Sequence, residues 1–370
     1  MANILDYIKW RGDISITASP FNAVDGLILS VLSYIPFEGI VTEKIEKSQK
    51  KGILLSEAAK QFSSKTIDAK LIRNEKDIEL FQSLSQAPRF ANLRLSFYIN
   101  KTDLEEEKQF SAITISLPDS TSFIAYRGTD LTLVGWKEDF NMSFRCPVPS
   151  QTEAVLYLSE VASHVKGKLR LGGHSKGGNL AVYAAAFCDT KIQKRIIEVF
   201  NNDGPGFEES VIQKKGYKRV EDRLFAFVPE SSIIGMLLEH NEEYIIVHST
   251  VSGGLMQHDP FSWSVEGADF IRKTEVRNSS LFVNKTIKDW VAATTPEQRE
   301  LFIDALWEII GSTKATNLTD FTKDWFKHAI AVNRSLKTLD EGTKKMLHET
   351  LGLLFSTAGK HFQMLFSAKK

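Results

Sequence analysis

The residues best suited to chemistry lie in the glycine-rich segment Gly172–Gly178, Gly-Gly-His-Ser-Lys-Gly-Gly, which contains Gly-x-Ser-x-Gly around Ser175. A strand-like run, Lys168–Gly172, precedes the serine, and an alanine-rich helical run, Asn179–Phe187, follows it. A turn this tight between strand and helix strains its central residue, and glycines on both sides leave the room it needs. A phosphate-binding loop has a different spacing, with its lysine before the hydroxyl residue. The segment therefore predicts that Ser175 is a nucleophile at the N-terminus of a helix.

A serine nucleophile needs a base, and eight histidines are available. In α/β hydrolases the chain order is serine, acid, histidine, so the base is expected late in the sequence. His258 lies in the irregular segment Gly253–Pro260, which follows the strand-like run Glu243–His248 and could fold back over a sheet. We predict His258 as the base, with His248 as the alternative.

Two carboxylates are candidates for the acid that orients this histidine. Glu230 follows the strand-like run Arg223–Val228, at the sheet end where such an acid normally lies. Asp203 follows the preceding strand-like run, Ile196–Phe200, within a turn that contains Gly-Pro-Gly. Glu230 is the preferred acid and Asp203 the alternative. Either would fix the imidazole tautomer and stabilise the imidazolium without taking the proton itself.

Two further motifs make the pattern more specific. Ala125–Thr129 reads Ala-Tyr-Arg-Gly-Thr after a strand-like run, and Trp136–Phe140 reads Trp-Lys-Glu-Asp-Phe soon afterwards. Together with Gly-His-Ser-x-Gly-Gly at 173–178, they resemble the class 3 lipases over about residues 109–260. The whole chain is similar to a bacterial branch of that superfamily, whose members mostly lack an assigned substrate.

The resemblance also implies roles for residues of the first motif. It places Thr129 in an oxyanion hole, whose second donor would be the backbone N–H of Lys176. Arg127 and Asp139 would hold this loop through a charge-assisted bond. The chain departs from the lipase pattern at Phe227–Ser232, where Phe-Val-Pro-Glu-Ser-Ser replaces Asn-Asp-x-Val-Pro, and this departure affects the choice of acid.

The elements around these motifs predict an α/β-hydrolase fold, a mainly parallel sheet flanked by helices with helical N-terminal and C-terminal additions. The runs Gln109–Leu117 and Thr121–Tyr126 form a predicted hairpin, and strands then alternate with helices. Outside this core, helices are expected at 25–34, twice within 66–98 around Pro88, from Pro296 to 310, at 318–332 and at 340–356. The predicted organisation is a helical region at 1–100, a hydrolase core at 101–270 and a helical appendage at 271–370.

Composition narrows the possible partners. The 46 basic residues balance 46 acidic ones, so no nucleic-acid partner is expected. The two cysteines, Cys146 and Cys188, form no metal-binding or disulfide pattern, and the predicted chemistry needs no cofactor. The charged N-terminal residues do not resemble a secretory signal, and no apolar run approaches the roughly 20 residues that span a bilayer. A cytoplasmic location is expected.

These observations predict a serine hydrolase that cleaves small acyl esters or lipid-derived esters through a Ser-His-acid triad and an acyl-enzyme. The alternatives are an acyltransferase or thioesterase on the same triad, or a binding protein that has kept the fold without turnover. Because ester substrates are apolar, we expect the helices around Leu27–Tyr34 or Leu301–Ile310 to cover the site and shape an acyl pocket. Alternatively, both helices only cover the sides of the sheet.

Overall fold

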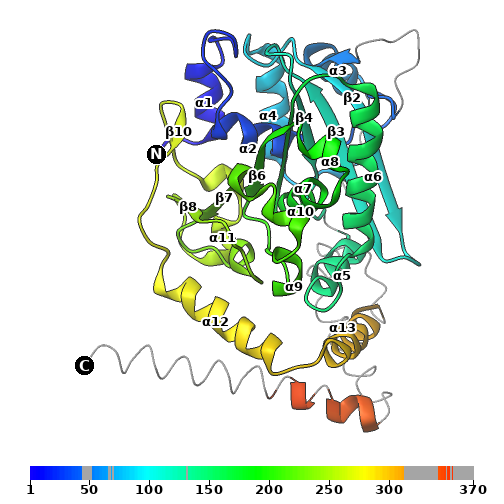
Figure 1. Cartoon of the computed structure of the whole chain (residues 1–370). Helices are drawn as coiled ribbons and strands as arrows, with labels where there is room; N and C mark the ends of the chain where they lie inside the picture. Colours follow the sequence, from blue (N-terminus) through cyan, green and yellow to red (C-terminus); the bar gives the residue numbers. More distant parts are fainter. Residues whose placement is uncertain are drawn as a thin grey trace.

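The computed structural model describes residues 1–43, 52–65, 68, 71–130, 132–311, 341–346, 348–350 and 352. The helix predicted at 318–332 lies outside these residues, and part of the one predicted at 340–356 does too; the described residues within 341–352 are helical. The centre of the molecule is a sheet of eight strands that follow one another in chain order (Figure 1). They are β1 (Ile53–Leu54), β2 (Arg94–Asp103), β3 (Lys108–Ser116), β4 (Ser122–Tyr126), β5 (Leu169–His174), β6 (Ile196–Asn202), β7 (Leu224–Pro229) and β8 (Tyr244–Val247).

The sheet changes direction at β4. Strands β1 to β4 pair antiparallel, whereas β4 to β8 pair parallel. The predicted hairpin is present as β3 and β4, and the predicted parallel strands after it are all found. Parallel strands that advance in one direction with right-handed crossovers place their connecting helices on one face of the sheet. The carboxyl ends of β5, β6 and β7 therefore meet at one edge, where the chain turns into loops and helices.

The helices form layers around this sheet and at its lower edge (Figure 1). They are α1 (Ile4–Arg11), α2 (Ala23–Leu32), α3 (Leu55–Ser63), α4 (Glu75–Gln86), α5 (Leu133–Asn141), α6 (Pro149–His164), α7 (Lys176–Phe187), α8 (Thr190–Gln193), α9 (Glu209–Ile212), α10 (Lys215–Lys218), α11 (Gly254–Gln257), α12 (Asn278–Ala292) and α13 (Pro296–Gly311). No helix in the described part of the chain is long and apolar enough to cross a membrane.

The side chains of β4 alternate between two hydrophobic cores, as the period of two in a strand requires. Phe123 and Ala125 pack in the core that contains α1, α2 and α4, whereas Ile124 and Tyr126 pack in the core that contains α6 and α7. Both faces of the sheet are thus covered. The architecture is the α/β-hydrolase type that the sequence predicts.

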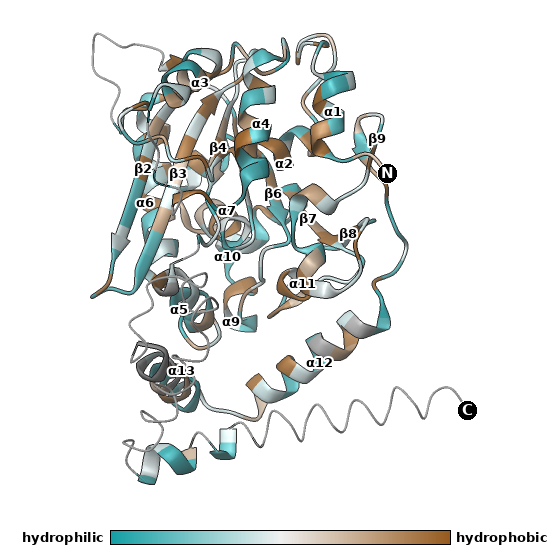
Figure 2. Cartoon of the chain, turned by 180° about the vertical axis from the view of Figure 1, so that it is seen from behind, coloured by the Kyte–Doolittle hydropathy of each residue, from teal (hydrophilic) through white to brown (hydrophobic). Residues whose placement is uncertain are grey.

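The N-terminal helices are an integral layer of this structure. Helix α2 is apolar and buried on nearly all sides, and its colour in Figure 2 reflects this composition. It packs so closely on the sheet that a Cβ at Gly26 would lie 3.1 Å from the ring of Phe200. Asp25, in the first turn of the helix, forms a fully buried ion pair with Arg89, with 2.8 Å between Oδ1 and Nε. The domain boundaries at 100 and 270 stay predictions.

One predicted element is wrong. Of the two helices expected within 66–98, the described residues of that range contain only α4, and the residues from Arg94 onward form strand β2. The pairing of β2 with β3 is irregular between Ser96 and Ile99, where Phe97 has a φ of 53°. This irregularity interrupts the alternation of apolar and polar residues, so the strand lacks the period that would identify it.

Candidate active site

Ser175 occupies the turn between β5 and α7, where the sequence predicts it. Its backbone has φ 60° and ψ −136°, in the region that residues with a side chain rarely adopt. The flanking glycines are required by contact distances. A Cβ at Gly173 would lie 2.1 Å from the carbonyl carbon of Gly177, and a Cβ at Gly177 would lie 2.1 Å from the carbonyl oxygen of Tyr126. Such strain at a turn is typical of a functional residue that the surrounding structure holds in place.

Ser175 and His258 line the same cavity, which has a volume of about 560 Å³. Its wall is mainly apolar, as in most small-molecule sites. Most of the apolar side chains come from the loop after β7 and from α11, α12 and α13; they are Ile234, Leu237, Leu238, Leu255, Ile287, Trp290, Val291, Phe302 and Ile303. Trp136 and Phe140 of α5, Met142 after it and Pro205 add to this wall. Tyr34, which follows α2, also lines it. Both helical regions expected to cover the site therefore contribute to the cavity, and α12 contributes without having been predicted.

Asp203 supports the imidazole of His258. The Nδ1 atom of His258 lies 2.7 Å from Oδ2 of Asp203, whose side chain is fully buried. The other carboxylate oxygen accepts hydrogen bonds from Ser232 Oγ at 2.5 Å and the Gly235 amide at 3.2 Å. A carboxylate at Nδ1 keeps the proton there and leaves Nε2 free to accept one.

Within the described residues, no hydrogen bond joins the hydroxyl of Ser175 to the imidazole of His258. Both groups nevertheless belong to one cavity wall. Bonds of this kind are often long in the absence of substrate and shorten when the substrate binds.

Glu230 has a different partner. Its Oε1 accepts a bond of 2.9 Å from Arg277 Nη2, and its backbone oxygen accepts one from the Arg277 amide. Glu230 thus holds the residue that precedes α12. The alternative base, His248, lies beside Ser264, with 2.8 Å between Nδ1 and Oγ. The structure therefore brings Asp203, the alternative acid of the sequence analysis, to the imidazole, and it pairs the preferred acid, Glu230, with Arg277 instead.

His174, the neighbour of Ser175, contacts His258 in a way that the sequence did not indicate. Its Nε2 lies 2.8 Å from the backbone oxygen of His258, and its Nδ1 lies 3.0 Å from the hydroxyl of Tyr34. Burial lowers the pKa of His174 well below its ordinary value, so the ring is neutral and has one donor and one acceptor. Nε2–H therefore donates to His258, and Nδ1 accepts from Tyr34. Tyr34 is 140 positions away, and no spacing in the sequence reveals such a contact.

The loop with Gly128 and Thr129 lies directly against the turn of Ser175. A Cβ at Gly128 would lie 2.2 Å from the Tyr34 hydroxyl oxygen and 3.1 Å from Cβ of Ser175. Thr129 lines the cavity, and its hydroxyl donates to Asp139 Oδ2 over 2.5 Å. Lys176 begins α7, so its amide has no acceptor within the helix. The two residues expected to hold an oxyanion thus both lie beside the serine.

The remaining motif residues support this loop. The ammonium of Lys176 is buried and donates to Gln109 and, over 2.9 Å, to Glu138 Oε2. The side chain of Lys176 therefore links α7 to α5. Its backbone amide remains the group of this residue that is suited to bind an oxyanion. Arg127 pairs with Asp130 at 3.2 Å instead of forming the expected bond with Asp139.

A family model described as Mbeg1-like matches residues 84–308, more than half of the chain. The chain belongs to the Mbeg1-like family. This is a class 3 lipase-like family, so the resemblance to class 3 lipases holds at that level, whereas nothing supports a bacterial branch. Among curated proteins, none matches the chain.

Two solved structures show a distant similarity to this Mbeg1-like chain. M37 lipase is 15% identical with a TM-score of 0.35, and the match covers 57% of this chain and 68% of that one. The native Rhizomucor miehei lipase propeptide complex is 16% identical with a TM-score of 0.35, covering 53% and 67%. The assignment of the fold rests on the sheet and the site, because the similarity to these structures is low.

The carboxyl group of Asp139 should make the stability of this Mbeg1-like protein depend on pH. Burial raises the pKa of its carboxyl to about 6, against the lowering effect of Lys176 and of the Thr129 bond. Between about pH 4 and 6 the folded protein binds a proton here that the unfolded chain does not. The contribution of Asp139 to the free energy of unfolding must therefore fall as pH rises through this range, by at most about 3 kcal/mol.

In Asp139→Asn this contribution should disappear. Urea denaturation of both proteins between pH 4 and 7 measures the difference in slope. Asp269→Asn is a suitable control, because that carboxylate lies half exposed beside Arg272. Parallel curves for wild type and Asp139→Asn would contradict the raised pKa.

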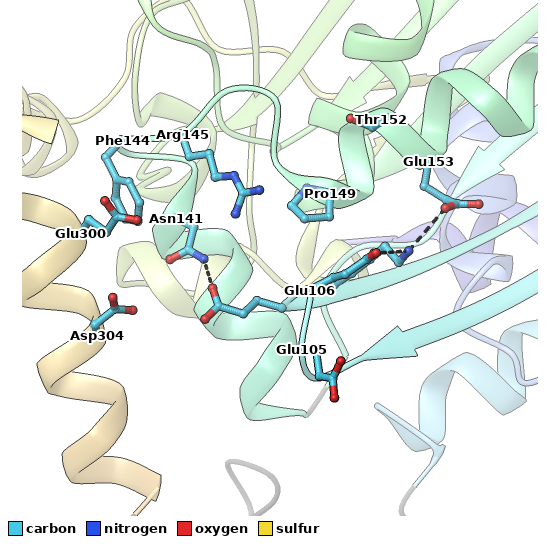
Figure 3. Close-up of a pocket in the computed structure, with 12 residues that line it drawn as sticks. Glu105, Glu106, Asn141, Phe144, Arg145, Pro149, Thr152, Glu153, Glu300 and Asp304 are labelled. Carbon is cyan, nitrogen blue, oxygen red and sulfur yellow. Dashed lines mark hydrogen bonds and ion pairs between the residues drawn. The ribbon is translucent and has the colours of Figure 1, made fainter. Parts of the chain in front are cut away.

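A second cavity, of about 620 Å³, lies between the β2–β3 turn, α5 and α13 (Figure 3). Its wall carries carboxylates from both sides, among them Glu105, Glu106, Glu300 and Asp304. None of the described residues that line it is a serine, cysteine or histidine. In the described residues no group of acidic, histidine and cysteine side chains could hold a metal ion either. The cavity with Ser175 is therefore the candidate active site.

Proposed function

We propose that this protein is a serine hydrolase that cleaves carboxylic esters, with Ser175 as nucleophile, His258 as base and Asp203 as the orienting acid. The observation that carries the proposal is the bond between His258 and the buried Asp203, in a cavity that the strained Ser175 also lines. A surface histidine has no need of such a partner. Membership of a lipase-like family agrees with this chemistry.

The proposed reaction is a double displacement. His258 Nε2 takes the proton of Ser175 as Oγ attacks the ester carbonyl, and then gives that proton to the departing alcohol. A water molecule, activated by the same imidazole, hydrolyses the acyl-enzyme and restores the serine. Asp203 holds the tautomer in both halves, and His174 holds the backbone of His258 through its bond of 2.8 Å.

The negative oxygen of each tetrahedral intermediate needs donors that are already in place. The amides of Thr129 and Lys176 are suited to this role, because the packing of Gly128 keeps their loops together. The bond from the Thr129 hydroxyl to Asp139 fixes the loop on its other side. Each such donor typically contributes roughly a hundredfold to a thousandfold to the rate.

The apolar wall supplied by α12 and α13 is proposed to hold the acyl chain. Val291, on α12, lines the cavity, so Val291→Phe should shorten the space for the chain. The variant should lose roughly tenfold in kcat/KM on p-nitrophenyl laurate relative to p-nitrophenyl acetate, since a misfit of one or two methylenes has effects of this size.

Leu281→Phe is the matched control for this prediction. Leu281 lies on the same helix, is 48% exposed and does not line the cavity. Its chain-length profile should equal that of wild type. An unchanged profile in Val291→Phe would instead assign the acyl chain to another part of the wall.

A fluorophosphonate probe tests the function itself, because it reacts with a serine only when the base and the oxyanion donors act together. Wild-type protein should acquire one adduct on the peptide that contains Ser175 and should lose p-nitrophenyl acetate hydrolysis in step with labelling. A folded protein that neither reacts with the probe nor cleaves the ester would be a binding protein with a hydrolase fold.

A further inference from the structure

Arg73 lies in the wall of the cavity that contains Ser175 and His258. Its guanidinium carbon is 3.9 Å from the centre of the Tyr34 ring. The Tyr34 hydroxyl bonds His174, and His174 in turn bonds the backbone of His258. A short chain of contacts thus places a cationic side chain on the His258 side of the cavity.

Only some of the N–H donors of this guanidinium bond to other residues of the protein. The buried Asp77 accepts from Nε at 3.1 Å and from Nη2 at 2.6 Å. In the described part of the chain, Nη1 has no hydrogen-bond partner, and it is not among the polar atoms closed off from solvent. The Arg73 side chain is 17% exposed. Arg73 therefore lines the cavity with a guanidinium whose Nη1 has no partner among the described residues.

The other charged groups of the wall are already engaged. Lys176 has its ammonium on Gln109 and Glu138, while Asp139 accepts from Thr129 and Asp130 accepts from Arg127 and Thr132. Asp77 offsets the charge of Arg73, so recognition here depends on directed N–H donors more than on net charge. Such donors suit an oxyanion, because charge-assisted bonds from arginine to carboxylate or phosphate are the stronger kind.

The proposed reaction defines which part of a substrate meets Arg73. The imidazole of His258 must reach the departing oxygen to protonate it, so the alcohol portion of the ester leaves on the His258 side. The apolar side chains of α12 and α13 line the same cavity, whereas Arg73 enters its wall beside Tyr34 from the segment just before α4. We therefore assign the acyl chain to the apolar helices and the alcohol to the wall that contains Arg73.

Resting on the proposed function, we propose that Arg73 binds an anionic group, a phosphate or a carboxylate, on the alcohol portion of the ester. The substrate class is then an acyl ester of a phosphorylated or carboxylated alcohol. Arg73 would act in binding and not in bond making. A purely structural Arg73, which only joins Tyr34 to Asp77, would affect every ester alike.

Three hexanoyl esters, short enough to stay monomeric, distinguish a binding role of Arg73 from a purely structural one. They are tested on the full-length protein. Hexanoyl glycerol is neutral, hexanoyl glycerol phosphate carries a phosphate and hexanoyl lactate carries a carboxylate. Wild type should prefer at least one anionic ester to the neutral one by roughly tenfold to hundredfold in kcat/KM, chiefly through a lower KM. The anionic ester that is preferred identifies the group.

The variant Arg73→Gln should reduce this preference to about one, and Lys76→Gln should preserve it. Lys76 is half exposed in the first turn of α4, three positions after Arg73, and does not line the cavity. If Arg73→Gln does not fold, glycerol phosphate and lactate still serve as competitive inhibitors of p-nitrophenyl acetate hydrolysis by wild type, and at least one should inhibit more strongly than glycerol.

Equal use of all three esters by wild type, or a preference that survives in Arg73→Gln, would overturn the assignment of Arg73. Those results would leave the proposed function intact as long as p-nitrophenyl acetate is cleaved. Failure to cleave any ester would instead remove the proposed function, and the role of Arg73 with it.

Discussion

Ser175→Ala is expected to lower hydrolysis of p-nitrophenyl acetate by roughly a millionfold, the scale of loss when a nucleophile of this kind is removed. The change deletes one oxygen and keeps the Cβ, so the strained turn at φ 60° meets the same contacts as before. The packing of Gly173 against Gly177 is untouched. Thermal unfolding should therefore change little while activity and fluorophosphonate labelling disappear together.

Ser143→Ala is the matched control. Ser143 lines the same cavity, but its hydroxyl donates to the Phe140 backbone over 2.8 Å and has no basic partner. This variant should retain labelling and hydrolysis. A folded Ser175→Ala protein with full activity would contradict the proposed nucleophile, and equal losses in both variants would indicate general damage to the cavity.

The position of Ser175 could be predicted from sequence because its determinants are local. The strand, the glycines and the following helix all lie within twenty positions of one another. Strand β2 shows the opposite case, because its irregularity at Ser96 and Ile99 removes the alternation on which prediction depends. Helix α12, which supplies Trp290 to the cavity, lies in the predicted helical appendage, but its own bounds were not predicted.

The acid could not be chosen by the same reasoning. Asp203 follows β6 and Glu230 lies one residue beyond β7, so both lie at the carboxyl edge of adjacent parallel strands. Which carboxylate meets His258 depends on the path of the chain from β8 through α11, a tertiary property. The bond from His174 to the His258 backbone and the bond of Gln257 to the Ser231 amide fix that path.

Asp203→Asn should lower kcat by roughly ten-thousandfold, with little effect on KM for p-nitrophenyl acetate. An amide nitrogen can donate to Nδ1 of His258, which favours the tautomer with its proton on Nε2, and that nitrogen then cannot accept the serine proton. The loss should be smaller at high pH than at neutral pH if hydroxide can replace the imidazole. A pH profile of kcat for both proteins measures this.

Glu230→Gln is the decisive comparison, because Glu230 was the acid that the sequence favoured. Its side chain is 9% exposed and pairs with Arg277, which is 53% exposed; the amide oxygen of glutamine can still accept the Arg277 bond, so the variant should stay folded. Activity should stay within about twofold of wild type, since no charged group is removed from His258. The reverse pattern, an active Asp203→Asn and an inactive but folded Glu230→Gln, would mean that the histidine shifts to the other carboxylate during turnover. The contacts of Asp203 with Ser232 and Gly235 oppose such a shift, because they leave the carboxylate fixed on the His258 side.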